Sequence, residues 1–140
     1  MSQENVEFVC RWYASIPDVR DADPRDDRAF FDLAFGDYLD ERWELRLPAG
    51  DLVFRGREGL VALVAMLRDT WAEWRFEVER FLDAGDRVVV FVCVVAKCSA
   101  SGAPIELSTA HVVTVRDGRI PSAQVYQDRE EALKAVGLRE

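Results

Sequence analysis

The sequence of 140 residues contains one histidine, three cysteines and no long run of apolar residues. A helix that crosses a membrane needs about 20 consecutive residues that are mostly apolar, and no stretch approaches that length. Residues 1–5 also lack the basic region and the apolar run of a signal peptide. We therefore expect a cytoplasmic protein that does not insert into a membrane.

Residues that hold metals and cofactors are scarce. A lone histidine without Asp or Glu at ligand spacing does not make a metal site, and the odd number of cysteines (Cys10, Cys93 and Cys98) lacks metal-ligand spacing. The sequence has no glycine-rich phosphate loop, and no serine has a base within its own motif. We expect no metal and no cofactor.

The charge balance excludes another group of partners. The net charge of −8 repels nucleic-acid phosphates and anionic membrane surfaces, and no cluster of Lys and Arg reverses that charge locally. Neither nucleic acid nor a membrane is an expected partner. The length fits one domain that spans residues 1–140.

Three apolar segments near the C-terminal end form the clearest pattern. The segments 87–97, 105–115 and 119–126 read as strands, separated by a small polar turn and by Asp117-Gly118, a dipeptide typical of tight hairpins. They predict a three-strand antiparallel meander. Its first strand is apolar at nearly every position, so both faces must be covered. Helices can cover one face, and a second subunit of a homodimer could cover the other.

The remaining elements surround this meander. Ser2 can cap a helix that ends before Pro17, and residues 18–28, with five aspartates and three arginines, read as a solvated loop. Asp128 can cap a last helix that ends at Gly137. The patterns between them predict a short aromatic helix after Asp26 or Asp27, a strand at 42–47, a helix from Leu60 to Trp71 and a strand at 75–82.

Four short segments resemble a known family when they are taken in order. They are 54–59 (Phe-Arg-Gly-Arg-Glu-Gly), 83–88, 110–120 and 126–132. With the order of elements, they resemble the SnoaL-like branch of the NTF2-like superfamily, whose members share the ketosteroid isomerase and polyketide cyclase fold. The resemblance implies a cone-shaped, cystatin-like α+β fold. In that fold a curved, mostly antiparallel sheet wraps helices around an apolar pocket, and its outer face commonly forms a homodimer.

The resemblance also implies where chemistry would occur. Tyr13 matches the first-helix tyrosine that donates a hydrogen bond in the isomerase-like members. The aspartate that acts with it is replaced by Ala110, and matching a strand proline to Pro48 puts no carboxylate at the base position. Glu44 could serve as the base in a shifted register, or could pair with Arg46 at the surface. The known isomerase constellation is therefore incomplete.

His111 is the candidate proton carrier, because imidazole has a pKa suited to acid and base work. The sequence does not decide which face of the sheet the His111 side chain occupies. If Ala110, Val112 and Thr114 face the pocket, alternation sends His111 to the outer face and the dimer interface, which is the orientation that we favour. The other phase would put His111 beside a bound molecule.

These observations lead to two functional expectations. The first is an internal pocket that binds a small, mostly apolar organic molecule and carries out cofactor-free acid/base chemistry through Tyr13, His111 or Glu44. The second is a noncatalytic domain that binds ligands or proteins. Candidate ligand-binding residues, which could equally be core or wall residues, are Phe30, Trp43, Trp71, Gln124 and Tyr126.

Overall fold

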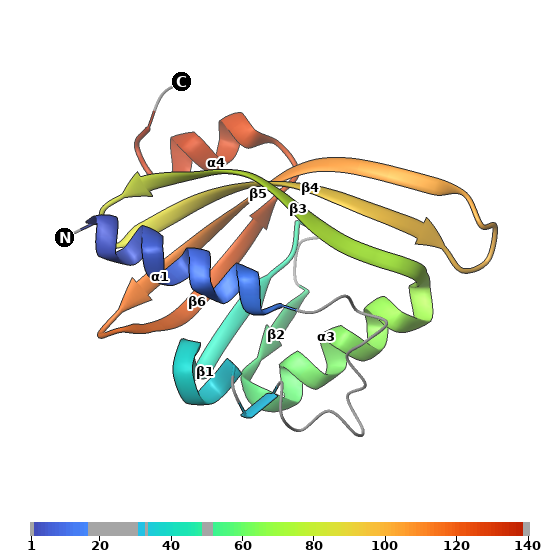
Figure 1. Cartoon of the computed structure of the whole chain (residues 1–140), viewed down its shortest axis with the longest axis horizontal. Helices are drawn as coiled ribbons and strands as arrows, with labels where there is room; N and C mark the ends of the chain where they lie inside the picture. Colours follow the sequence, from blue (N-terminus) through green and yellow to red (C-terminus); the bar gives the residue numbers. More distant parts are fainter. Residues whose placement is uncertain (1, 17–30, 33, 49–51, 139–140) are drawn as a thin grey trace.

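The computed structural model describes residues 2–16, 31–32, 34–48 and 52–138, and it has the predicted α+β class (Figure 1). The predicted acidic loop, its following N-cap and Phe30 lie outside the described residues. The described elements, in chain order, are α1 (Ser2–Ser15), η1 (Ala34–Tyr38), β1 (Leu39–Arg46), β2 (Val53–Arg55), α3 (Gly56–Thr70), β3 (Trp71–Ala84), β4 (Arg87–Cys98), β5 (Pro104–Arg116), β6 (Arg119–Tyr126) and α4 (Arg129–Ala135).

One six-stranded sheet has the order β2-β1-β6-β5-β4-β3. Neighbouring strands are antiparallel except β1 and β6, which run parallel. The predicted meander is confirmed as β4, β5 and β6. Asp117 and Gly118, at the β5–β6 turn, have φ values of 53° and 71°, the left-handed conformation that a tight hairpin of this kind requires.

Helices cover both faces of the curved sheet (Figure 1). On the inner face, alternate β4 residues such as Val88, Val90 and Val92 pack in the main core with residues of α1 and α3. On the outer face, Val89 and Phe91 pack in a second cluster with residues of α4. The apolar sequence of β4 had suggested that a partner subunit could cover its outer face. Around Val89 and Phe91 that face is covered by α4, a helix of the same chain. Dimerisation itself stays a prediction.

Among the boundaries that differ from the sequence-based prediction, two concern where a strand begins. Trp71 was expected to end the third helix, but it has extended φ and ψ values of −121° and 130° and begins β3. β1 begins at Leu39, three residues before the predicted strand, and follows the π-helical turn η1 directly. In both cases the strand begins before the residues that alternate clearly in the sequence. The first residue of each strand, Trp71 or Leu39, packs in the main core on the inner face of the sheet.

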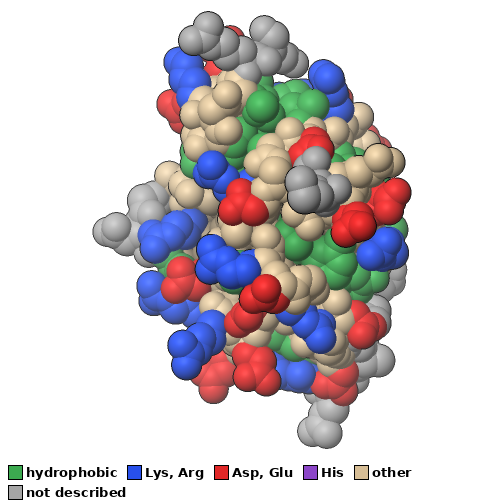
Figure 2. All heavy atoms as spheres, turned by 90° about the vertical axis from the view of Figure 1, so that its left-hand side faces the viewer, with side chains coloured by type: hydrophobic (Ala, Val, Ile, Leu, Met, Phe, Trp, Pro, Cys, Tyr) green, Lys and Arg blue, Asp and Glu red, His purple; other side chains and the backbone are tan. Residues whose placement is uncertain are grey.

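The face at the left of Figure 1 carries basic and acidic side chains side by side (Figure 2). No broad area of one charge is visible there, and no histidine reaches this surface. Among the described residues, no helix has the length and apolar character needed to span a bilayer.

Candidate functional site

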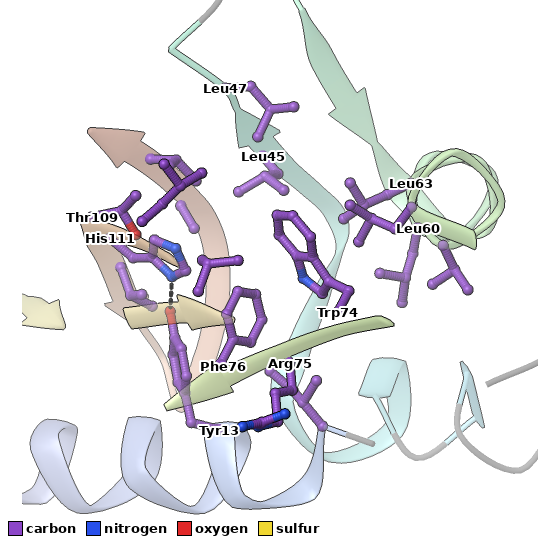
Figure 3. A pocket seen from close by; sticks show the side chains of 18 of the residues that line it. Tyr13, Leu45, Leu47, Leu60, Leu63, Trp74, Arg75, Phe76, Thr109 and His111 are labelled. Carbon is purple, nitrogen blue, oxygen red and sulfur yellow. Dashed lines mark hydrogen bonds between the residues drawn. The ribbon is translucent and has the colours of Figure 1, made fainter. Parts of the chain in front are cut away.

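The inner face of the sheet encloses a cavity of about 880 Å³ between α1, α3 and the strands (Figure 3). Its lining is mostly apolar and includes side chains of α1, β1, α3, β3, β4, β5 and β6. Aromatic residues form part of the wall without filling the space. Such a concave, apolar space with few polar groups is typical of small-molecule sites.

The polar centre of this cavity is a contact between Tyr13 and His111. The Tyr13 hydroxyl lies 2.6 Å from Nδ1 of His111, although the two residues are 98 positions apart in the sequence. Tyr13 comes from α1, on the concave side of the sheet, and His111 projects toward it from β5 (Figure 3). The rings are also in contact, with their centroids 5.8 Å apart.

Burial keeps both groups neutral. His111 is 8% exposed, and removal from water lowers the pKa of its imidazole to about 4. Burial also raises the pKa of the Tyr13 hydroxyl well above its ordinary value. Tyr13 is only partly buried as a whole residue, but its hydroxyl contacts the buried His111 ring. Near pH 7 the contact is therefore a hydrogen bond between an uncharged phenol and an uncharged imidazole.

Two proton arrangements fit this geometry. In one, the Tyr13 hydroxyl donates to Nδ1, and Nε2 of His111 carries the proton and is a donor. In the other, Nδ1 of His111 donates to the Tyr13 oxygen, the hydroxyl donates elsewhere, and Nε2 is an acceptor. Nε2 has no hydrogen-bond partner within the described part of the chain. The pair can thus present either a donor alone or a donor together with a base.

Charged groups contribute little to the cavity wall. None of the described lining residues is Asp or Glu, and Arg75 is the charged one among them. Its position is paired with Val95, on the outer face of the sheet, and its side chain is 52% exposed and lies 3.3 Å from the Glu77 carboxylate. A bound molecule would therefore meet mainly apolar and neutral polar groups.

The favoured outward orientation of His111 is wrong. In the ladder His111 is paired with Val90, which belongs to the inner core, and alternation puts Thr109, His111 and Val113 on the cavity side. Ala110 packs in the outer cluster with α4. Both faces of β5 are apolar around this point, so the sequence pattern did not determine the phase.

The same phase corrects the prediction for β6. Val125 is paired with His111 and lines the cavity, whereas Tyr126 is paired with Ala110 and packs in the outer cluster. Gln124 is exposed on that outer side. The cavity-facing residues of this segment are Ala123, Val125 and Gln127. Gln124 and Tyr126 are thus not wall residues.

Glu44 lies outside the cavity lining and forms a salt bridge with Arg55, with 2.8 Å between its Oε1 and Nε. This hydrogen bond lowers the pKa of the Glu44 carboxyl. The predicted surface pairing is therefore present, but its partner is Arg55 instead of Arg46. The structure does not bring Glu44 to Tyr13 and His111.

Trp43 and Trp71 do line the cavity, from β1 and from the start of β3. Trp12 was missed: it is 9% exposed and also lines the cavity. The spacing of Val9, Trp12 and Ile16 could have identified this face of α1, because residues three, four and seven apart share one side of a helix. That any of these residues binds a ligand stays a prediction.

Comparison with known proteins identifies the family. The model of the SnoaL-like domain matches residues 27–122. The chain belongs to this family. The match covers more than half of the SnoaL-like chain and includes η1, β1 to β5 and the start of β6. No curated protein matches the sequence significantly.

Solved structures share the fold. A protein of ketosteroid isomerase-like fold from Catenulispora acidiphila DSM 44928, in complex with trimethylamine, is 20% identical, with a TM-score of 0.68 and 95% of this chain and 94% of that chain covered. A protein from Jannaschia sp. CCS1, named for its likeness to SnoaL-like polyketide cyclases, is 18% identical, with a TM-score of 0.68 and coverage of 99% and 94%. TerC, co-crystallised with polyporic acid, is 22% identical, with a TM-score of 0.68 and coverage of 95% and 98%. The predicted NTF2-like fold is confirmed.

Proposed function

We propose that this SnoaL-like protein binds a small, mostly apolar organic molecule in its internal cavity. The observation that carries the proposal is the neutral Tyr13–His111 contact of 2.6 Å within an otherwise apolar wall. The wall favours burial of a hydrocarbon frame, and the pair offers a hydrogen bond to an oxygen of that frame. Proteins of the same fold that were crystallised with trimethylamine or polyporic acid support a binding role for such a cavity.

A bulky side chain inside the cavity tests this proposal. Ala123 lines the cavity, and its neighbour Gln124 is exposed on the opposite face of β6. With 9-fluorenone, a flat aromatic ketone, as the calorimetric probe, we expect Ala123→Trp to weaken binding at least tenfold by occupying the space. Gln124→Trp is the matched control and should leave the affinity unchanged. Equal affinities in both variants, or no binding to the unmodified protein, would contradict the proposal.

The second proposed function is cofactor-free acid/base catalysis, which the Tyr13–His111 contact supports in its donor-plus-base arrangement. Nε2 of His111 takes a proton from a carbon next to a carbonyl, while the Tyr13 hydroxyl donates a hydrogen bond to the carbonyl oxygen that becomes an enolate. Return of the proton from His111 to another carbon completes an isomerisation. Attack of the enolate carbon on a second carbonyl forms the new carbon–carbon bond, and the oxygen of that carbonyl then takes the proton from His111, which completes a cyclisation. With a pKa of about 4, His111 is a weak base, so the substrate must carry an acidic C–H bond.

Exchange of acidic hydrogens for deuterium tests catalysis without knowledge of the substrate. We expect the protein to accelerate exchange at the α-carbon of 2-tetralone in deuterated buffer, with a rate that stays level between about pH 5 and 8 because His111 is already neutral there. His111→Gln should abolish the acceleration, and Tyr13→Phe should lower it about 10- to 100-fold. If exchange is no faster than in buffer, or if His111→Gln leaves it unchanged, the noncatalytic binding function remains as the proposal.

A further inference from the structure

The β3 wall of the cavity contains a polar atom that the Tyr13–His111 pair does not use. Nε1 of Trp74 has less than 1 Å² of exposed surface and no hydrogen-bond partner. Within the described part of the chain, it is the one buried side-chain nitrogen or oxygen atom in this state. Folded proteins pair nearly all such atoms, because burial of an unpaired N–H group costs stability. The unpaired donor therefore requires an explanation.

The position of Trp74 connects this donor with the cavity. Trp74 is paired with Ala96 on the inner face and lines the cavity. Its ring lies 6.1 Å from that of Phe76, and the Phe76 ring lies 5.4 Å from the imidazole of His111. Figure 3 shows Trp74 and His111 on either side of Phe76. The wall thus has a polar group at each end, separated by one aromatic side chain.

A ligand acceptor explains the unpaired group better than packing alone. The Trp74 N–H is a donor only, and the lining offers it no carboxylate. A site that is built to donate a hydrogen bond discriminates strongly against molecules without the matching acceptor. Because less than 1 Å² of Nε1 is exposed, the indole must rotate slightly as the acceptor arrives.

We propose that Trp74 determines specificity by donating a hydrogen bond from Nε1 to an acceptor oxygen of the bound molecule. The inference deepens the proposed function and rests on it: the ligand class becomes apolar molecules with a carbonyl or similar neutral oxygen at the β3 wall, away from the atom that contacts His111. A pure hydrocarbon of the same shape is the disfavoured ligand.

Fluorene and 9-fluorenone are a matched probe pair, because they differ by one carbonyl group. We expect the unmodified protein to bind fluorenone about five- to tenfold more tightly than fluorene, the ratio that corresponds to one typical hydrogen bond. Trp74→Phe should reduce this ratio to about 1–2 by removing the N–H group. Trp71→Phe is the matched control, because Trp71 lines the same wall at 5.5 Å from Trp74, and it should keep the ratio.

The outcomes separate this inference from the proposed function. If both probes bind, but the ratio survives Trp74→Phe and disappears in His111→Gln, the Trp74 assignment is overturned and the cavity proposal stands. Equal affinity for both probes in the unmodified protein also overturns the assignment alone. Failure of both probes to bind overturns the two proposals together.

Nuclear magnetic resonance keeps the test available if Trp74→Phe does not fold. The protein has four tryptophans, so its indole N–H signals can be assigned by elimination with Phe variants at the other three positions. We expect the Trp74 N–H proton to move downfield with fluorenone and to stay in place with fluorene. The same small shift with both probes would overturn the assignment.

Discussion

The charge state of His111 is decided by its surroundings and not by its sequence neighbours. Tyr13, Phe76 and Val90 enclose the imidazole, and no described lining residue supplies a carboxylate that would stabilise the imidazolium form. The neutral ring can form the hydrogen bond to the Tyr13 hydroxyl, so His111 loses no hydrogen bond by staying uncharged. The residue at the centre of the site is consequently a polar but uncharged group.

The first prediction concerns the pH dependence of stability. His111 has a pKa of about 4 in the folded protein and near 6.5 when unfolded. Between these values the unfolded chain binds more protons, so the contribution of His111 is fully present above pH 6.5 and is lost as the pH falls to 4. The loss amounts to about 3 kcal/mol of unfolding free energy. Urea unfolding at several pH values measures it.

The variant His111→Gln supplies the control, because glutamine does not titrate. The difference in unfolding free energy between the unmodified protein and the variant should shrink by about 3 kcal/mol between pH 7 and pH 4. Since His111 is the single histidine, its imidazole resonance can also be followed directly. A titration midpoint at or above pH 6 would refute the buried neutral state.

The sequence could predict that Tyr13 faces the cavity, but not the direction of His111. Tyr13 followed from the family resemblance, and a helix with one polar face and one apolar face has a single way to pack. In β5, residues 109–113 are all buried, because the cavity lies on one side and α4 on the other. Without a wet face, alternation gives two equally consistent phases.

The contact between α3 and β2 depends on one glycine. A Cβ atom at Gly59 would lie 2.8 Å from the carbonyl carbon of Phe54, a backbone atom that cannot easily move. We predict that Gly59→Ala lowers the free energy of unfolding by about 1–2 kcal/mol, since the overlap outweighs the gain in helix propensity. Gly36→Ala is the control, because nothing lies within 4 Å there. Denaturant unfolding measures both variants, and a Gly59→Ala protein as stable as the control would contradict the close approach.

Elements bounded by clear turn or capping residues were predicted better than elements without such residues. Asp117-Gly118 fixed the hairpin between β5 and β6, and Asp128 caps α4 by accepting a hydrogen bond from the backbone N–H of Glu130. The boundary between α3 and β3 has no Gly or Pro, and the aromatic residues there suit either element. The sequence could not predict which face of the sheet α4 covers, because that depends on packing between segments that are far apart in the chain.

The whole molecule presents an outer sheet face that α4 covers only in part. Val95 lies on this face, beside Arg75 of β3 and Glu106 of β5 in the strand register, and it is half-buried. Leu82, Val89 and Phe91 at the other end pack in the cluster with α4. The family resemblance points to the outer face as a dimer interface, and we propose that the part around Val95 serves this purpose.

Sedimentation at micromolar concentration tests this proposed assembly. We expect a homodimer for the unmodified protein and a monomer for Val95→Glu, because burial of one added carboxylate from each subunit at the same interface costs more than the contact contributes, even with Arg75 beside it. Leu107→Glu is the matched control: Leu107 lies on the adjacent strand and is 45% exposed, but on the opposite face of the sheet. That variant should remain dimeric. A monomeric unmodified protein, or dissociation by both substitutions, would exclude the interface around Val95 and leave α4 as the cover that the apolar β4 strand requires.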